Sequence, residues 1–442
     1  MNNRGAEAPP PKAGDLPFPG IAPGTPNKEL PFDHLVVVLM ENHSFDNLLG
    51  ALRLTRPDVD GLRFDESAHA TDSNPGAGAT SPVVRSFPFA STAQAKHVSQ
   101  SWKATHEQID GGAMDGFVRS VKAAEPMGYY TPDILPFAYS FASTFAIANR
   151  WFCSVPGPTY PNRRFLLAGT AYGATVTSLA NSLLEGPPPN GTIMDQLSAH
   201  NVSWANYFTD IPMTSVIPAS AIKHLDHLHP ISKFHHDCLA GTLPSVSFVD
   251  PAVGAFSSIA RAFEDLPQLV KDALRLIGAK PPEIPPGETE EDPQCMYYGE
   301  LWAYETVEAV LRSPAWERTL LIYTYDEHGG YYDHVPPPAA IPPDDIVPTL
   351  APDDPHGGYD IYGPRVPAII ASPYAKSGTT INTVYDHTSI LATMEEKWNL
   401  PALTDRDANA NSVGAALDAA AAPQLDPPKL AAPSQGGPSG PG

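Results

Sequence analysis

The stretch LLIYTYDEHGGYYDHVPPP, residues 320–338, decides how this chain folds and where its chemistry lies. Its first part is a continuous apolar run, typical of a strand that is buried on both faces of a parallel sheet. The run ends abruptly in two adjacent carboxylates, Asp326 and Glu327. Side chains at the carboxyl end of such a strand face the crevice in which open α/β sheets bind ligands. Two neighbouring carboxylates repel each other, so the pattern predicts a bound cation, most naturally a divalent metal.

The beginning of the chain repeats this design. LVVVLM, residues 35–40, is a second unbroken apolar run, and Glu41 and Asn42 follow it directly. Either polar pair alone is compatible with a solvated turn. Two such pairs in distant parts of the chain, each ending a buried-type strand, predict one oxygen-rich metal site. Its expected ligands are Glu41, Asn42, Asp326 and Glu327.

The composition indicates a folded domain between proline-rich ends. The chain has 442 residues, of which 42% are hydrophobic, and its 51 prolines are concentrated in a few segments. Residues 1–30 are expected to form a disordered or extended tail, and residues 412–442 an Ala-, Pro- and Gly-rich tail. We expect a single domain over residues 31–411.

Strand-like and helix-like segments alternate within this domain. Leu243–Pro251 and Arg365–Ala375 resemble further strands, whereas Leu266–Leu276 and Tyr298–Pro314 have helical periodicity. This alternation predicts an α/β fold with a mostly parallel central sheet covered by helices on both faces. Residues 336–362 have no periodicity, and a loop of this length beside a site is expected to wall or cover it.

Charge and hydropathy exclude several classes of protein. The net charge of −22 argues against nucleic acid as a partner. No apolar run is long enough to predict a transmembrane helix, and no signal peptide is visible, so a cytoplasmic location is expected, with export by another route left open. The three distant cysteines are expected to be free thiols: Cys153, Cys238 and Cys295.

A candidate nucleophile lies in PGPTYPNRR, residues 156–164. Thr159 stands between two prolines, which stiffen the turn, and a helix is expected to begin close by. Backbone N–H groups at a helix N-terminus favour anions, and Arg163 and Arg164 add positive charge. A hydroxyl becomes a usable nucleophile when a metal lowers its pKa. The alternative, that Thr159 only caps the helix, stays open at this stage.

Several ordered motifs together resemble one known family, the phosphoesterases that include non-specific, phosphatidylcholine-preferring phospholipases C and a bacterial acid phosphatase. These motifs are MENHSFDNLLG (40–50), MDGF (114–117), PGPTYPNRR (156–164), SPAWERTLLIYTYDEHGGYYDHVPPP (313–338), YGPRVPAIIASPYA (362–375) and YDHTSILATMEEKWNLP (385–401). The resemblance spans about Phe32 to Leu403. It implies an alkaline-phosphatase-like fold.

The resemblance also implies roles for individual residues. Thr159 would be the nucleophile beside the metal held by the four oxygen ligands, and His106 would contact the phosphoryl group or act as general acid. Arg163 would bind the phosphate, together with His235 or His236. The family usually has a His-Pro dipeptide where this chain has Asp292-Pro293, so the resemblance does not determine which histidines face phosphate.

These observations predict a metal-dependent phosphoric ester hydrolase of phospholipase C type that acts through a phosphothreonine intermediate. An acid phosphatase with the same site is the alternative, and a non-catalytic binding protein that keeps the fold is a third reading. A sulfatase is disfavoured, because SVPGP follows Cys153 in place of the formylglycine motif. The expected cofactor is Ca²⁺, Mg²⁺, Mn²⁺ or Zn²⁺, and the expected partner is a phospholipid or a small phosphate ester. The oligomeric state is not predicted.

Overall fold

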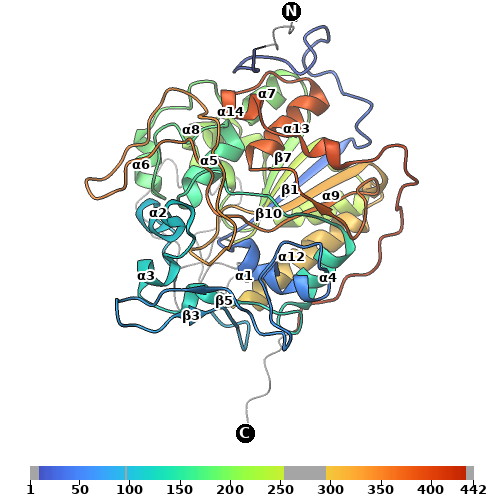
Figure 1. The fold of residues 1–442 in the computed structure, drawn as a ribbon. Helices are drawn as coiled ribbons and strands as arrows, with labels where there is room; N and C mark the ends of the chain where they lie inside the picture. Colours follow the sequence, from blue (N-terminus) through green and yellow to red (C-terminus); the bar gives the residue numbers. More distant parts are fainter. Residues whose placement is uncertain (1–8, 95–96, 253–294, 435–442) are drawn as a thin grey trace, which may run out of the picture.

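An eight-stranded sheet forms the centre of the protein (Figure 1). The computed structural model describes residues 9–94, 97–252 and 295–434. In spatial order the strands are β12 (Thr380–Ile381), β6 (Ala146–Ala148), β11 (Ala368–Ala371), β10 (Thr319–Tyr325), β1 (His34–Met40), β9 (Val246–Asp250), β7 (Trp204–Phe208) and β8 (Leu228–Pro230). Strand β11 runs antiparallel to both of its neighbours, and all other neighbouring pairs are parallel.

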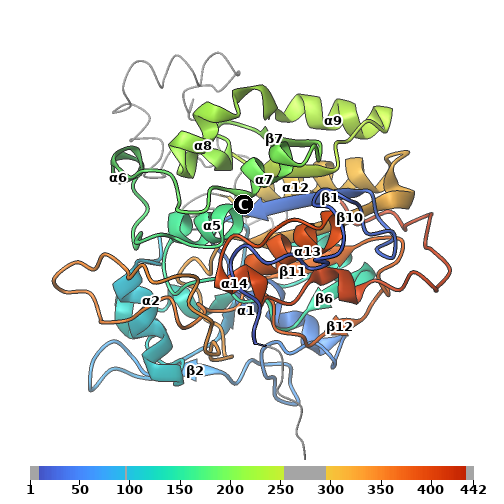
Figure 2. The ribbon, with the colours of Figure 1, turned by 90° about the horizontal axis from the view of Figure 1, so that it is seen from above.

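Helices cover both faces of this sheet (Figures 1 and 2). One layer contains α4 (Pro136–Thr144), α9 (Ile231–Ala240) and α12 (Met296–Leu311), and the other contains α5 (Thr159–Ala168), α7 (Ile193–Ala199), α13 (Thr388–Trp398) and α14 (Asp405–Ala408). The fold class predicted from the sequence, a mostly parallel sheet between helical layers, is therefore confirmed. Among the described residues, no helix is long and apolar enough to cross a membrane.

Shorter elements surround these layers. They are α1 (Phe45–Leu49), α2 (Trp102–Ile109), α3 (Phe117–Val121), α6 (Leu179–Leu184), α8 (Pro218–Lys223), and the short strands β2 (Ser73–Asn74), β3 (Val84–Arg85), β4 (Phe87–Pro88) and β5 (Gly128–Tyr129). Residues 336–362 form an irregular loop, whose two ends meet in a bridge between Ala339 and Ile361.

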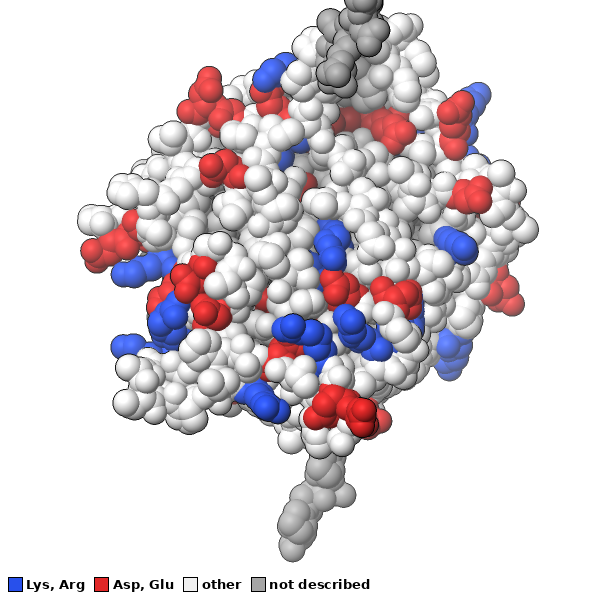
Figure 3. Space-filling model, viewed as in Figure 1, with Lys and Arg blue, Asp and Glu red and all other residues white. Residues whose placement is uncertain are grey.

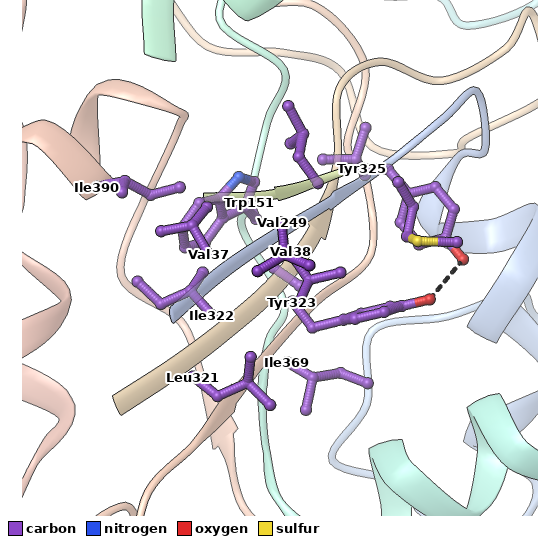
Figure 4. Packing of buried hydrophobic residues seen from close by; sticks show 14 of the residues in the cluster. Val37, Val38, Trp151, Val249, Leu321, Ile322, Tyr323, Tyr325, Ile369 and Ile390 are labelled. Carbon is purple, nitrogen blue, oxygen red and sulfur yellow. Dashed lines mark hydrogen bonds between the residues drawn. The ribbon is translucent and has the colours of Figure 1, made fainter. Parts of the chain in front are cut away.

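The central strands are apolar on both faces because each face contacts a helical layer. Val37 and Ile322 are register partners on β1 and β10, and they point to the side on which Ile390 of α13 lies (Figure 4). Tyr323 and its register partner Ile369 point to the opposite side. All five side chains are almost completely buried. A strand that is buried in this way needs no alternation of polar and apolar residues, which explains the continuous runs in the sequence.

The predicted elements agree with the structure where the periodicity is long. The expected helix over Tyr298–Pro314 is α12, and the strands expected at residues 35–40 and Leu243–Pro251 are β1 and β9. The segment Arg365–Ala375 contains β11, but this strand is antiparallel, which a periodicity pattern does not reveal. The short strands β6, β7, β8 and β12 were not predicted. The helix expected at Leu266–Leu276 and the Asp292-Pro293 dipeptide lie outside the described residues.

Segments expected as tails pack against the domain where they are described. Residues 9–30 form no helix or strand, but Gly14 donates a backbone hydrogen bond to the carbonyl of Ala402 (2.8 Å). Near the other end, Leu430 is 2% exposed and its N–H donates to Glu308 Oε1 (3.2 Å). The folded unit therefore extends beyond the expected boundaries at residues 31 and 411.

Candidate active site

The ends of β1 and β10 bring the two predicted polar pairs together. These strands are parallel neighbours, and Met40 pairs in register with Tyr325. The next residues, Glu41 and Asp326, therefore leave the sheet side by side at its carboxyl edge. The backbone N–H of Asn42 donates to Asp326 Oδ1 at 3.1 Å. Segments that are far apart in the sequence thus form one buried polar cluster.

Asn42 is held in an unusual conformation within this cluster. Its φ is +69°, in the left-handed region that asparagine adopts more readily than most residues. Its side chain is 1% exposed, and neither Oδ1 nor Nδ2 has a hydrogen-bond partner among the described residues. Burying an amide without hydrogen-bond partners costs free energy. A ligand bound to the side-chain oxygen of Asn42 would offset this cost and so explain the arrangement.

Arg163 connects helix α5 to both carboxylates. Its Nε donates to Asp326 Oδ2 at 3.0 Å, and its guanidinium also donates to Glu41 Oε1 at 2.9 Å. The side chain is nearly fully buried. One guanidinium therefore contacts two carboxylates, and Glu327 follows Asp326 directly in the sequence, so acidic side chains outnumber basic ones among these residues. The local charge therefore favours a divalent cation.

Thr159 begins α5, one helical turn before Arg163. The capping residue of the helix is Pro158, with no side-chain capping bond, so Thr159 is the first helical residue and not the cap. Residues four apart lie on the same face of a helix. Because Arg163 reaches Glu41 and Asp326, Thr159 lies one turn nearer the helix start on that same face. Thr159 is 7% exposed.

The turn before Thr159 is fixed by Asn162. The Asn162 amide donates to the carbonyls of Gly157 (2.9 Å), Pro158 (3.2 Å) and Val155 (3.2 Å), and its Oδ1 accepts from the N–H of Val155 (3.1 Å). The helix N-terminus offers few free donors, because the N–H of the next residue, Tyr160, already donates to Thr177 Oγ1 (3.2 Å). Proline at 161 has no N–H. Positioning by Asn162 is therefore better supported here than anion binding by backbone amides.

Asp250 is a further acidic residue at this edge that the sequence interpretation missed. It ends β9, the strand on the other side of β1, and is 2% exposed. Burial raises its pKa to about 6, against the lowering effect of nearby Arg163. Its Oδ1 has no partner among the described residues. The sequence contained a signal for Asp250, because the apolar run SVSFVD ends in an acidic residue, and an acidic residue likewise follows β1 and β10.

Comparison with known proteins identifies the family of this chain. A sequence model of the Phosphoesterase family matches residues 32–401. The chain belongs to this phosphoesterase family. Non-specific phospholipase C1 of Arabidopsis thaliana is 32% identical over 405 residues, covering 86% of this chain and 69% of the relative. Phospholipase C A of Mycobacterium tuberculosis (strain H37Rv) is 27% identical over 443 residues, covering 91% and 80%. The protein is accordingly a phosphoric ester hydrolase.

Solved structures with a related arrangement are much more distant. A phosphonate monoester hydrolase of Agrobacterium radiobacter aligns with a TM-score of 0.36 and 13% identity, covering 87% of this chain and 77% of that one. A protein in the alkaline phosphatase superfamily from Vibrio parahaemolyticus gives 0.31 and 13%, covering 81% and 77%. Likeness at this level says nothing about the site residues.

The side chains of this phosphoesterase fit a divalent metal at the β1–β10 edge. Asn42 Oδ1 is buried and without a partner, and it adjoins Asp326 through the Asn42 backbone. Carboxylate and amide oxygens are the donors that Ca²⁺, Mg²⁺ and Mn²⁺ prefer. Glu41, Asn42, Asp326 and Glu327 are therefore the residues that would hold the ion.

His106 lies near residues 156–164, but the Trp102 ring stands between His106 and that segment. Its ring packs against Trp102 of α2 with centroids 4.5 Å apart, and a Cβ on Gly157 would lie 3.5 Å from the Trp102 ring. His106 Nδ1 is 2.7 Å from the carbonyl of Trp102, so Nδ1 carries the proton. In the neutral ring Nε2 is then an acceptor. Burial lowers the pKa of His106, which favours this neutral form.

His235 and His236 lie on α9, away from the carboxylate cluster. This helix packs against β7, β8 and β9 and against α12. The His235 ring contacts Phe234, and the exposed His236 ring pairs with Asp237 (3.4 Å). The contacts described for α9 do not include the segments that carry Thr159 or Asp326. Their predicted role in phosphate binding therefore has no structural support here.

His387 contacts the segment that carries Asp326 and Glu327. It immediately precedes α13, and its Nε2 donates to the backbone carbonyl of Asp326 at 2.6 Å. The neighbouring Asp386 accepts from Thr388 Oγ1 (2.5 Å) and Ser154 Oγ (2.8 Å). The contact with Asp326 depends on how α13 docks, which local sequence does not specify.

A buried ionic network joins the two segments that follow the site. Arg365 donates to both oxygens of Asp333 (2.9 and 3.1 Å) and to Asp46 (3.3 Å), and His334 contacts Asp46 at 2.6 Å. Asp46 follows the β1 pair, whereas Asp333 and His334 follow the β10 pair. Ligand atoms of Asp46, Asp333 and His334 lie within 4.8 Å of one another. The positive charges of Arg365 and His334 already balance these two carboxylates. The group therefore ties the segments after β1 and β10 together, and we call it the clamp.

The charge of His334 should make this clamp sensitive to alkaline pH. Burial alone would lower its pKa, but Asp46 outweighs this effect and raises the pKa to about 10, above the usual 6.5. A raised folded-state pKa stabilises the fold fully below pH 6.5, and this stabilisation is lost as pH rises through 10. We expect His334→Asn to lower the free energy of unfolding by about 3 kcal/mol at pH 6 and by much less above pH 10.

Urea unfolding of wild type and variant across this pH range measures the difference. His69→Asn is the matched control, because His69 pairs with Asp65 at 3.7 Å in an exposed position and should have little effect. A difference between wild type and His334→Asn that stays constant with pH would contradict the charged state of His334.

Proposed function

We propose that this phosphoesterase is a metal-dependent phosphodiesterase of phospholipase C type with Thr159 as its nucleophile. One observation carries the proposal. Thr159 begins the helix whose next turn presents Arg163, and Arg163 contacts Glu41 and Asp326. The hydroxyl is thereby directed toward the two strand ends that carry oxygen ligands. Arg163 is assigned as a positioning residue, because its donors are occupied by carboxylates.

The reaction then proceeds in two displacements. Thr159 Oγ attacks phosphorus, the bond from phosphorus to the leaving alcohol breaks, and the departing oxygen takes up a proton. Water next attacks the phosphothreonine, which releases the phosphorylated headgroup and restores the hydroxyl. A divalent cation, when bound, would stabilise charge on the phosphoryl oxygens and lower the pKa of the attacking hydroxyl. Asn162 keeps Thr159 in place through both steps by holding the preceding turn.

His106 is assigned to proton transfer. Its Nδ1–H is held by the Trp102 carbonyl, so its Nε2 lone pair is available in the neutral ring. That state suits a general base, which accepts the proton of the attacking water in the second displacement. The family resemblance implied instead that His106 contacts the phosphoryl group or acts as general acid. The lowered pKa of His106 makes the protonated form scarce at neutral pH, which supports the base.

Phospholipid or a related diester is the proposed substrate class. The similar curated proteins from Arabidopsis thaliana and Mycobacterium tuberculosis are named phospholipases C. Figure 3 shows basic and acidic side chains intermixed over one face of the protein, without an extended surface of one sign. Such a face offers nothing that would concentrate a polyanion such as nucleic acid.

Turnover of two chromogenic substrates tests this function. After chelation and reloading with Ca²⁺, Mg²⁺, Mn²⁺ or Zn²⁺ in turn, the protein should hydrolyse p-nitrophenylphosphorylcholine with at least roughly tenfold higher kcat/KM than p-nitrophenyl phosphate. The physical reason is that a diester carries one negative charge where a monoester carries up to two, and the carboxylates of the site repel the additional charge. The chelated protein should be inactive.

The alternatives give different results in the same assay. Preference for the monoester would replace the proposal with an acid phosphatase that uses the same residues. Hydrolysis of neither substrate under any metal would indicate a binding protein that retains the fold. Full activity of the chelated protein would contradict the metal requirement.

A further inference from the structure

Exposed aliphatic side chains gather where the long loop 336–362 meets the segment that follows α5. Val347 is 75% exposed, Ile346 is 37% exposed and Val176 is 46% exposed. The two segments are in contact, because the N–H of Thr349 donates to the carbonyl of Gly173 (2.8 Å). We call Val176, Ile346 and Val347 the apolar rim. Large apolar side chains rarely remain this exposed beside one another without a partner.

The tip of the loop is held in shape by anchors on both sides. The N–H of Ile346 donates to Asp344 Oδ1 at 2.8 Å, and the carbonyl of Pro343 accepts from the N–H of Asp405 at 3.0 Å. On the other side, the carbonyl of Thr349 accepts from Thr175 Oγ1 at 2.8 Å. The rim is therefore preformed. A preformed apolar tip loses little conformational entropy when it is buried.

The apolar rim is continuous with the candidate active site. Thr177, next to Val176, accepts the hydrogen bond from the N–H of Tyr160, the residue that follows Thr159. The far end of the same loop brings Tyr359 against Phe165 of α5 and against Trp102. In Figures 1 and 2 this loop projects outward on the side of the molecule that carries α2, α5 and α6. A surface that covers the rim would therefore lie beside the start of α5.

The chemistry of the rim favours a lipid surface over a protein partner. Protein interfaces are enriched in aromatic side chains and arginine, whereas the rim is entirely aliphatic and projects from loops. Asp344 and Asp345 precede Ile346 directly, so an anionic membrane would be repelled. A zwitterionic phospholipid surface accepts aliphatic tips without this repulsion.

We propose that the apolar rim inserts into a zwitterionic phospholipid surface and so brings the Thr159 end of α5 to the headgroup level. This inference rests on the proposed function, because it supplies the route by which a membrane lipid reaches that site. Insertion of tips such as these reaches about 5–10 Å below the headgroups. The rim thus serves binding to the surface, and the chemistry remains with the residues at the β1–β10 edge.

Vesicle sedimentation of the metal-loaded full chain tests the rim. Ile346→Asp combined with Val347→Asp should weaken binding to phosphatidylcholine vesicles by roughly 100-fold, since losing each buried aliphatic side chain changes partitioning about tenfold. Val347→Phe, which enlarges the apolar tip, should strengthen binding. Turnover of soluble p-nitrophenylphosphorylcholine should stay unchanged in these variants.

Leu239→Asp is the matched control. Leu239 is 81% exposed on α9, away from the rim, and its replacement should leave vesicle binding as in the wild type. Equal binding by the wild type and the double variant would overturn the proposal. So would stronger binding to vesicles containing phosphatidylglycerol, or a wild-type dimer in gel filtration that the double variant abolishes, which would make a second copy the occupant.

Two combinations of results distinguish failure of the proposed function from failure of the rim proposal. A wild type that binds phosphatidylcholine vesicles through the rim but hydrolyses no phosphoester with any metal would remove the catalytic proposal and leave the rim in place. A wild type that hydrolyses p-nitrophenylphosphorylcholine but does not bind these vesicles would remove the rim and leave the catalytic proposal.

Discussion

Replacing Thr159 with alanine should reduce kcat for p-nitrophenylphosphorylcholine by roughly 10⁴-fold or more, because loss of a covalent nucleophile has effects of this order. The bound metal and the melting temperature should change little, since Thr159 is the first helical residue of α5 and not its capping residue. Thr159→Ser should keep part of the activity, because it retains the hydroxyl. Steady-state kinetics and metal content per chain measure these expectations together.

A buried threonine near the other end of α5 provides the matched control. Within the described part of the chain, Thr170 Oγ1 accepts a single hydrogen bond, from the N–H of Tyr172 (3.0 Å), so Thr170→Ala should keep near-native kcat. If Thr159→Ala also keeps near-native kcat, the nucleophile is a water molecule and the phosphothreonine intermediate does not form. Trapping of phosphorylcholine on Thr159 at low pH, followed by mass spectrometry, would decide the matter independently.

Asp326→Asn should have the second largest effect, through loss of the metal. Asp326 Oδ1 accepts from the N–H groups of Asn42 (3.1 Å) and Glu327 (2.8 Å), and its Oδ2 accepts from Arg163 (3.0 Å). An amide in its place carries no charge, and its NH₂ group would face one of these donors. We expect metal affinity to fall by at least about 100-fold and kcat/KM by about 1,000-fold.

Metal analysis after gel filtration, together with a metal titration of activity, measures both changes. Asp133→Asn replaces an exposed carboxylate and serves as the control for general effects of charge removal. Unaltered metal content in Asp326→Asn would place the ion elsewhere. In that case the partnerless oxygens of Asn42 and Asp250 would be the first groups to examine by substitution.

The candidate metal ligands could be predicted from the sequence, because each follows a strand that is recognisable by its continuous apolar run. Apolar runs buried on both faces need no partner information to be recognised, and the polar residues that end them stand out. Asp250 follows the same rule and was missed only because a single acid after a strand is common. Thr159 could be singled out as a candidate because two prolines flank it. Its orientation was not, because that depends on the helix face that Arg163 occupies.

Other predictions depended on contacts that sequence patterns do not contain. The assignment of His235 and His236 to phosphate binding relied on resemblance alone, and α9 packs at the edge of the sheet formed by β7 and β8. Arg163 was expected to bind substrate because it is a cation near a nucleophile. In the structure its guanidinium contacts the carboxylates of Glu41 and Asp326, and only the packing of α5 against the strand ends determines this.

By itself, the sequence determined that β1 and β10 are buried strands, that polar residues with side-chain oxygens follow them, and that Thr159 lies in a turn stiffened by two prolines. These properties are local, because periodicity and turn chemistry depend on residues a few positions apart. Only the tertiary structure decided that β1 and β10 are neighbours, that Arg163 lies between their carboxylates, and that Arg365 clamps the segments beyond them. The reason is physical: the free energy of a buried charge depends on which groups surround it in space, and those groups come from distant parts of the chain.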